Sequence, residues 1–353
     1  MTSQKHVFIT GPAGFVGGYA VREFVKQGRH VFALVHKTTS RELEELARNG
    51  AVTIVRGDVT DFAPLKEALT RAVETRGAAL DAVIHCAGRA SDVGRRRTFR
   101  RVNFESVQRL VQIAKDLAVG RFVFVSTTDV YGLRDFHGEA EDELPLRAAL
   151  RNPYPEFKIA AENWIRDHLP PERYSIIRPA AVWGAGDRTL TPRIVGFLRR
   201  SPWIVHFGQW RGRNRWPLAH VRNVAAAIYL AATLPEAAGR AVNVLDDETT
   251  TIDEFYRLLA GIYLPHKTLR TVTLPLWVGA VFGCAVSAIS NLLNLDHPFA
   301  DPSLYALYSV SRHLDFSNRR FRELLAAAGR PIVTREQGIR ELRDHASRIA
   351  NER

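Results

Sequence analysis

The chain has 353 residues, a formal charge of +12 and 46% hydrophobic residues, a composition that excludes a disordered or fibrous protein. Two cysteines, Cys86 and Cys284, exclude a disulfide framework and a cysteine-rich zinc module, so no metal site is predicted. The residues after Met1 lack the apolar run and cleavage site of a signal peptide, which favours a cytoplasmic location.

The positive charge is mostly arginine, since only seven of the 49 basic residues are lysine. Its clusters, among them Arg95–Arg97 and Arg199–Arg200, are dispersed and are not interleaved with aromatic residues. They match no nucleic-acid-binding module, so no nucleic-acid partner is predicted. We interpret most of this charge as solvated surface.

Strand-like and helix-like segments alternate in chain order. Apolar, β-branched runs predict strands at 6–10, 30–35, 52–56, 81–85, 121–126, 174–178 and 241–245. Amphipathic segments between them predict helices at 14–27, 40–48, 62–75, 99–117, 154–168 and 220–234. The alternation predicts an α/β fold, a doubly wound parallel Rossmann sheet with a smaller interleaved C-terminal substrate-binding lobe. The predicted NAD(P)-binding domain takes residues 1–178 and about 219–246, and the lobe takes 179–218 and 247–353.

A glycine-rich turn joins the first predicted strand to the first predicted helix. Gly11, Gly14 and Gly17 form a G-x-x-G-x-x-G pattern, in which the first glycine allows a tight turn and the second lets the backbone approach a pyrophosphate. The amide groups at the helix N-terminus then bind phosphate. The residues predicted to bind a dinucleotide here are Gly11, Pro12, Ala13, Gly14, Phe15 and Val16.

The residues after the second strand indicate which dinucleotide is bound. A carboxylate there would bind the ribose 2′-hydroxyl, but this chain has His36 and Lys37, which suit a 2′-phosphate. NADP is therefore favoured over NAD, with a solvated loop charge as the other interpretation of Lys37. Asp58, followed by Val59, either contacts the adenine or caps the next helix.

Hydroxyl groups and one lysine form the predicted catalytic set. Tyr154 and Lys158 lie four residues apart, on one face of a predicted helix. We expect the Lys158 ammonium to lower the pKa of the Tyr154 hydroxyl, so that it transfers a proton near neutral pH. Ser126 and Thr127 end the fifth strand, at the edge where doubly wound sheets bind ligands. These hydroxyls either hydrogen-bond a reacting oxygen or satisfy their own loop.

Together with His85–Gly88 and Asn103, these motifs follow the order found in the extended short-chain dehydrogenase/reductases, which the chain resembles over essentially its whole length. Residues 178–184 and 216–227 are most similar to the 3β-hydroxysteroid dehydrogenase and dihydroflavonol reductase branch. The resemblance implies hydride transfer between NADP and a hydroxyl or ketone of an apolar substrate, whether steroid-like, β-keto or aromatic. It also implies a homodimer formed through the helices at 103–117 and 154–168.

The resemblance implies individual roles as well. Tyr154 would act as acid or base, Lys158 would hold the nicotinamide ribose, and Thr127 with Ser126 would polarise the substrate oxygen. Asn103 would hold a water or backbone group for a proton relay, or else simply pack its helix. The implied cofactor-binding set also includes Cys86, Ala87, Gly88, Tyr154, Lys158, Pro179, Ala181 and Val182.

Some positions depart from other branches of the superfamily. Ala181 stands where nucleotide-sugar enzymes usually have Asn, and Thr128-Asp129 stands where 4,6-dehydratases have Asp-Glu. Arg222 replaces the Asp of a common H-V-D-N stretch, so no role is assigned to it. Two alternatives to the reductase hypothesis are a sugar or polyol epimerase acting through a transient ketone and a non-catalytic NADP-binding regulator.

One segment, Thr271–Leu295, has no charged residue in 25 positions, a length that could span a bilayer. After Pro275 it predicts a helix with a weakly polar stripe of Ser287, Ser290, Asn291 and Asn294. The interpretations are a membrane span, a helix at a membrane surface or over an apolar pocket, and an ordinary buried helix. Peripheral membrane contact through 271–295 is therefore one expectation for this chain.

Overall fold

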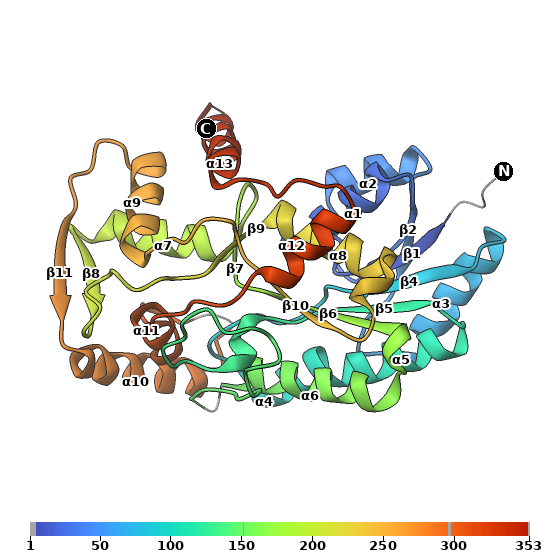
Figure 1. Cartoon of the computed structure of the whole chain (residues 1–353), viewed down its shortest axis with the longest axis horizontal. Coiled ribbons are helices and arrows are strands. Elements are labelled where there is room, and N and C mark those ends of the chain that lie inside the picture. Colours follow the sequence, from blue (N-terminus) through green and yellow to red (C-terminus); the bar gives the residue numbers. More distant parts are fainter. Residues whose placement is uncertain (1–4, 151, 296–297, 352–353) are drawn as a thin grey trace.

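A computed structural model describes residues 5–150, 152–295 and 298–351, and its central element is a seven-stranded parallel sheet (Figure 1). The strand order is β10-β6-β5-β4-β1-β2-β3, with the chain reversing direction across the sheet after β3. The strands are β1 (His6–Thr10), β2 (His30–Val35), β3 (Val52–Arg56), β4 (Leu80–His85), β5 (Arg121–Val125), β6 (Tyr174–Pro179) and β10 (Ala241–Val244). The predicted Rossmann sheet is confirmed, and each predicted strand is present with bounds within one residue.

Helices cover both faces of this sheet, because its strands are apolar on both sides. One buried cluster joins the sheet to α1 (Phe15–Lys26), α2 (Arg41–Arg48) and α8 (Val221–Thr233). The other joins it to α3 (Phe62–Thr75), α5 (Ser106–Asp116) and α6 (Pro153–His168). The sheet therefore separates two cores.

The predicted helix at 99–117 is divided into three parts. α4 (Arg96–Phe99) is followed by a π-helical turn, η1 (Arg100–Glu105), and then by α5. The wide turn places Asn103 inside the protein, where it is buried. Such π-helical turns often occur at functional sites, and no periodicity of apolar residues reveals them.

The remaining elements lie beyond the carboxyl ends of β5 and β6. Two short parallel pairs, β7 with β9 and β8 with β11, connect helices α7, α9, α10 and α11 at the left of Figure 1. Their bounds are β7 (Ala181–Trp183), α7 (Leu190–Arg200), β8 (Trp203–Phe207), β9 (Leu218–His220), α9 (Ile252–Tyr263), β11 (Arg270–Leu274), α10 (Leu276–Leu292) and α11 (Leu304–Ser311). Short 3₁₀ turns complete the connections at η2 (Thr128–Tyr131), η3 (Pro171–Arg173) and η4 (Pro235–Ala237).

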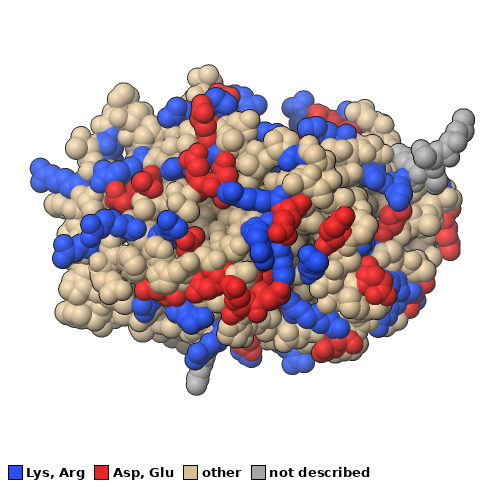
Figure 2. Space-filling view, viewed as in Figure 1, with Lys and Arg blue, Asp and Glu red and all other residues tan. Residues whose placement is uncertain are grey.

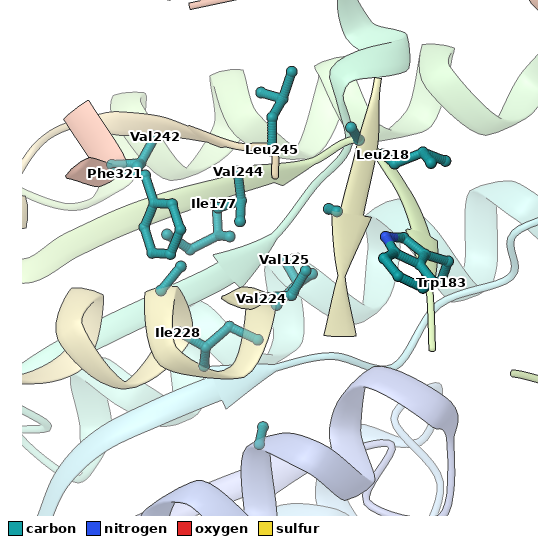
Figure 3. Packing of buried hydrophobic residues seen from close by; sticks show 14 of the residues in the cluster. Val125, Ile177, Trp183, Leu218, Val224, Ile228, Val242, Val244, Leu245 and Phe321 are labelled. Atoms are coloured by element: carbon teal, nitrogen blue, oxygen red, sulfur yellow. The ribbon is translucent and has the colours of Figure 1, made fainter. Parts of the chain in front are cut away.

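The C-terminal residues return to the sheet. α12 (Arg319–Ala327) packs against α8 and β10, and α13 (Arg335–Asn351) lies beside α9. Figure 3 shows Phe321 of α12 next to Val242 of β10, within the cluster that also contains Ile228 of α8. Thus α12 completes the core of the sheet, although the sequence groups it with the predicted substrate lobe.

The helix predicted after Pro275 is confirmed as α10. Across residues 5–150, 152–295 and 298–351, every helix is too short or too polar to cross a membrane. The spanning interpretation of 271–295 is therefore not supported.

Candidate active site

The predicted dinucleotide site coincides with a cavity of about 710 Å³ at the carboxyl ends of β1 and β2. Nine residues named from the sequence line it, and they come from four separate loops, after β1, β2, β3 and β4. They are Gly11, Pro12, Ala13, Gly14, His36, Lys37, Asp58, Val59 and Ala87. The cavity lies where open parallel sheets bind nucleotides.

The glycine turn fits a pyrophosphate sterically. Gly11 has φ +70°, and a Cβ there would lie 2.9 Å from the Ala87 nitrogen. A Cβ on Gly17 would lie 2.0 Å from the Gly11 oxygen, so only glycine lets α1 begin so close to β1. Since the first amides of α1 face this turn, the chain has the tight turn and the positive helix end that a dinucleotide phosphate requires.

Basic side chains surround the other end of the same cavity. His36 Nε2 lies 3.4 Å from Asp58 Oδ2, and Lys37 is exposed beside them. Asp58 accepts a hydrogen bond from the Thr60 amide at 2.8 Å, while Asp61, not Asp58, is the N-cap of α3. The helix-cap interpretation of Asp58 is therefore wrong, and its carboxylate stays at the cavity wall.

Several predicted cofactor residues lie outside this cavity. Phe15 and Val16 form the first turn of α1, and Cys86 and Gly88 flank Ala87 after β4. Pro179, Ala181 and Val182 end β6 and form β7, so they lie beyond the β5 end of the sheet, on the substrate side. Their contacts with a cofactor stay predictions.

The predicted catalytic residues come together where β5 ends. Thr127 caps η2 and accepts the Asp129 amide at 3.2 Å. Tyr154 is the second residue of α6, where the Asn152 side chain caps the helix by accepting the Tyr154 amide at 2.9 Å. One turn later, the Lys158 ammonium donates to the Val125 carbonyl at 2.7 Å and lies close to Gly88. Residues far apart in sequence thus converge on one strand end.

The electrostatics of Tyr154 differ from the sequence expectation. Burial raises the pKa of its hydroxyl and the Asp129 carboxylate raises that pKa further, while a hydrogen bond with Thr127 partly offsets them. The Lys158 ammonium donates to the Val125 carbonyl, and Lys158 is not among the groups that shift this pKa. Burial lowers the pKa of Lys158 itself to about 8. Tyr154 is therefore protonated at neutral pH and is prepared to donate a proton.

Ser126 has a different function from its neighbour. Its hydroxyl donates to Glu162 Oε1 at 2.6 Å, and Glu162 is fully buried in an ion pair with Arg178, with Nη2–Oε2 at 2.5 Å. This network ties β5, α6 and β6 together below the site. Since the Ser126 hydroxyl is already committed, Thr127 is the hydroxyl beside Tyr154.

Asn103 binds a backbone group. Its Oδ1 accepts from the Arg89 amide at 2.7 Å and its Nδ2 donates to the Arg89 carbonyl at 2.9 Å. The side chain therefore fixes the loop after β4. This is the backbone-holding role that the sequence allowed, and it places Gly88 against Lys158.

A second cavity, of about 350 Å³, lies next to this cluster. Most of its lining is apolar. Tyr305 of α11 lines it and lies near the catalytic residues: burial raises the pKa of the Tyr305 hydroxyl most, and the charges of Asp129 and Tyr154 raise it further. The apolar lining is Leu190, Ile194, Phe197, Val205, Phe207, Trp216, Phe282, Pro302, Ala306 and Val310. The space suits a hydrophobic ligand.

One polar cluster interrupts that lining. Arg193 of α7 makes two bonds to Asp92, at 3.0 and 2.8 Å, and a third to Asp301 at 2.6 Å. Ser303 donates to Asp92 as well, at 2.5 Å. Two carboxylates against one guanidinium leave a net negative charge, so this wall disfavours an anionic ligand.

Comparison with known proteins identifies the architecture. The model of the NAD dependent epimerase/dehydratase family matches residues 7–244, about two thirds of the chain and nearly all of the central sheet. The chain belongs to this family. The family and the relatives described below show that the chain is an NAD(P)-dependent oxidoreductase acting on CH–OH or keto groups.

Curated relatives are similar at modest identity. A 2-alkyl-3-oxoalkanoate reductase of Stenotrophomonas maltophilia is 27% identical over 74% of this chain and 76% of its own. A 3 beta-hydroxysteroid dehydrogenase/Delta 5-->4-isomerase of Mycobacterium tuberculosis is 28% identical over 72% of this chain and 69% of its own. Among solved structures, UDP-glucuronic acid 4-epimerase of Bacillus cereus with UDP-glucuronic acid and NAD shares the fold, with a TM-score of 0.69, 18% identity and coverage of 98% and 99%.

Several residues that line the two cavities were not predicted from the sequence. Arg95, Arg97 and Arg101 line the cofactor cavity, although the sequence indicated only solvated arginines there. Asp92, Arg193 and Tyr305 line the second cavity and belong to no motif. The sequence signal was the position of Arg95–Arg101 in the segment that follows β4 and Ala87, since a loop there faces the nucleotide.

Proposed function

We propose that this chain is an NADP-dependent oxidoreductase that transfers hydride between the nicotinamide and the hydroxyl or ketone carbon of an apolar, uncharged substrate. The observation that carries the proposal is the convergence of Thr127, Tyr154 and Lys158 at the end of β5, beside an apolar cavity. When bound, the cofactor supplies or accepts the hydride, and the chain supplies the proton, the orientation and the exclusion of water.

Tyr154 acts as the proton donor when a ketone is reduced. Its raised pKa keeps the hydroxyl protonated at neutral pH, and Thr127 orients it. A protonated phenol next to a carbonyl oxygen stabilises the negative charge that develops there. In the oxidation direction the same raised pKa makes proton removal costly, which favours reduction as the working direction.

Lys158 positions groups rather than activating Tyr154. Its ammonium is buried, is held by the Val125 carbonyl, and lies beside Gly88. A lysine placed there would hold the ribose hydroxyls of the nicotinamide nucleoside. The pKa of about 8 leaves it charged at neutral pH.

The cavity residues support NADP over NAD. Lys37, His36, Arg95, Arg97 and Arg101 line the cavity, with Asp58 as the only carboxylate among the lining residues. A 2′-phosphate binds well among such cations, because charge-assisted hydrogen bonds to phosphate are strong.

The second cavity supports an uncharged, apolar substrate. Ten apolar side chains line it, and its one charged cluster, Asp92 with Arg193 and Asp301, has net negative charge. A steroid-like or aromatic ketone, or a neutral β-keto ester, satisfies this lining, whereas a free carboxylate would lie close to Asp92.

The decisive experiment follows NADPH absorbance with steroid, β-keto ester and aromatic ketones for the wild type and for Tyr154→Phe. We expect the variant to lose about 10²–10⁴-fold in kcat because no other group replaces the phenol proton. Its affinity for NADPH, measured by fluorescence, should be unchanged. The matched control, Tyr263→Phe in α9, removes a hydroxyl far from the cluster and should turn over normally.

The outcomes separate the alternatives. Tight NADPH binding with no ketone turnover would favour the non-catalytic regulator, and cofactor-dependent interconversion of sugar nucleotides would favour the epimerase. A Tyr154→Phe enzyme with a normal rate would remove this residue from the mechanism.

Lys37→Ala tests the cofactor assignment. We expect the ratio of kcat/KM for NADPH over NADH to fall about tenfold or more, because one charge-assisted contact to the 2′-phosphate is lost. Lys26→Ala, an exposed lysine at the end of α1, is the control and should keep the ratio. An unchanged preference in Lys37→Ala would contradict the proposed phosphate contact.

A further inference from the structure

The helix α10 presents its large apolar side chains to solvent. Trp277 is 69% exposed, Val281 68% and Leu292 84%. Phe282, Ile289 and Leu293 are exposed as well, and we call these six residues the outer face. Surface helices normally bury such residues, so this cluster of exposed apolar side chains is unusual for a surface that contacts only water.

The opposite side of α10 packs inward with its small and polar residues. Gly283 lies so close to α11 that a Cβ would be 3.0 Å from the Leu304 Cα, and one on Gly279 would be 2.7 Å from Leu307. Ser287 accepts the Leu304 amide at 2.9 Å, and Asn291 accepts the Gly94 amide at 2.9 Å. The Ser287 and Ser290 part of the polar stripe therefore faces the protein, whereas Asn294 is exposed, and the usual amphipathic arrangement is inverted over most of α10.

Positive charge flanks the outer face at both ends. At the C-terminal end, the Asn291–Gly94 bond brings in the loop with exposed Arg95 and Arg97, which also lines the cofactor cavity. At the N-terminal end, Gly208 lies against Leu276, and the loop after it carries exposed Arg211 and Arg213.

α10 itself lies in the 25-residue uncharged segment. Residues 188–235, which include the Arg211 and Arg213 loop beside it, contain eight arginines and no acidic residue, and three of these arginines, Arg193, Arg215 and Arg222, pair with carboxylates from other segments. In Figure 2 the lower left corner, where Figure 1 places α10, is mostly tan, with basic side chains along the left edge above it.

The outer face is continuous with the second cavity. Phe282 lines that cavity and is also 48% exposed, so it stands at the cavity's edge. Tyr305 of α11, against which α10 packs, lines the same cavity next to the catalytic residues. An apolar molecule leaving the outer face would thus enter the cavity beside Phe282.

We propose that the outer face of α10 docks on the surface of an anionic lipid bilayer, with its apolar side chains at the boundary of headgroups and acyl chains. Apolar residues on one side of a helix and flanking cations are what such surfaces bind. A second copy of the chain fits less well. In a twofold pair the arginines at the helix ends would face arginines of the other copy. The docking stands by itself, while delivery of substrate past Phe282 rests on the proposed function.

The experiment is flotation of the full chain with vesicles of phosphatidylcholine alone and of an equimolar mixture with phosphatidylglycerol. We expect binding to the mixed vesicles, weaker binding without the anionic lipid, and weaker binding at high salt. Val281→Glu with Leu292→Glu should weaken binding about tenfold or more, because two charges enter the apolar contact. The control, Ile349→Glu with Ala350→Glu on exposed positions of α13, adds the same charge and should bind as wild type.

Circular dichroism and turnover of a water-soluble ketone check that the Val281/Leu292 variant is folded. Vesicle binding is read without turnover, so failure of the docking and failure of the proposed function are distinguishable. Absence of wild-type binding to mixed vesicles overturns the docking, as does equal loss in both double variants. A third result would also overturn it. The wild type would be a dimer by light scattering, the Val281→Glu, Leu292→Glu variant would be a monomer, and neither the wild type nor the variant would bind vesicles.

Discussion

At the scale of single residues, the site places Tyr154 and Asp129 together, and the pKa of each is raised. Asp129 lies two residues after Thr127, and burial raises the pKa of its carboxyl to about 6, with a smaller contribution from the charge of Asp92. Its charge in turn raises the pKa of Tyr154. Asp129 therefore adjusts the catalytic phenol without belonging to any motif named from the sequence.

Asp129→Asn tests this coupling through stability. The unfolded carboxyl titrates near 3.9, so the folded state binds the proton more tightly and wild-type stability should fall as pH rises from about 4 to about 6. The amide does not ionise, and above about pH 6 we expect the variant to be more stable by about 1–3 kcal/mol, with little gain near pH 4. Urea unfolding across this range measures it.

The control for that series is Asp344→Asn, an exposed carboxylate of α13. The same Asp129→Asn protein should lose reductase activity at a lower pH than wild type, because Tyr154 without the neighbouring charge loses its proton sooner. If the stability of the variant followed that of the wild type across the range, Asp129 would not be the buried acid described above.

At the scale of elements, α10 is attached to the protein by glycines. Gly279 and Gly283 let its backbone approach α11, and Ser287 accepts a hydrogen bond from the amide of Leu304, the first residue of α11. A periodicity of apolar residues cannot reveal this orientation, because α10 has no charged residue to mark a solvent face and most of its large apolar residues are exposed.

Gly283→Ala should destabilise the protein by about 1–3 kcal/mol, since the added methyl meets the backbone of Leu304 and α10 must shift. Gly261→Ala in α9 is the matched control. A Cβ there has nothing within 4 Å, so alanine should be neutral or stabilising by about 0.5–1 kcal/mol through its helix propensity. Thermal and urea unfolding compare the two. Equal effects would mean that α10 does not pack closely at Gly283.

Elements were the most predictable level of this fold. The strands from β1 to β6 and β10 were named within one residue, because buried parallel strands are continuous apolar runs between glycines and polar loops. The π-helical turn η1 was missed because it inserts no unusual residue. β7 and β9 were missed because three residues give too short a pattern, and β8 and β11 because neither is a continuous buried apolar run.

At the scale of the whole molecule, charge and apolar surface are unevenly distributed. The excess of arginine is partly placed at the cofactor cavity through Arg95, Arg97 and Arg101, and partly in ion pairs such as Arg178–Glu162 and Arg193–Asp92. The C-terminal α12 closes the sheet through Phe321, so the two predicted parts of the chain share one core.

The sequence by itself determined the sheet, the glycine turn, the Tyr154–Lys158 pair on one helix and the Thr127 strand end. These features depend on local periodicity and on residues up to four positions apart, so they can be read directly from the sequence. Only the tertiary structure decided that Lys158 donates to the Val125 carbonyl, that Glu162 holds Ser126, and that α10 turns its apolar face outward. Side-chain direction and burial depend on contacts between residues distant in sequence, so no local pattern contains them.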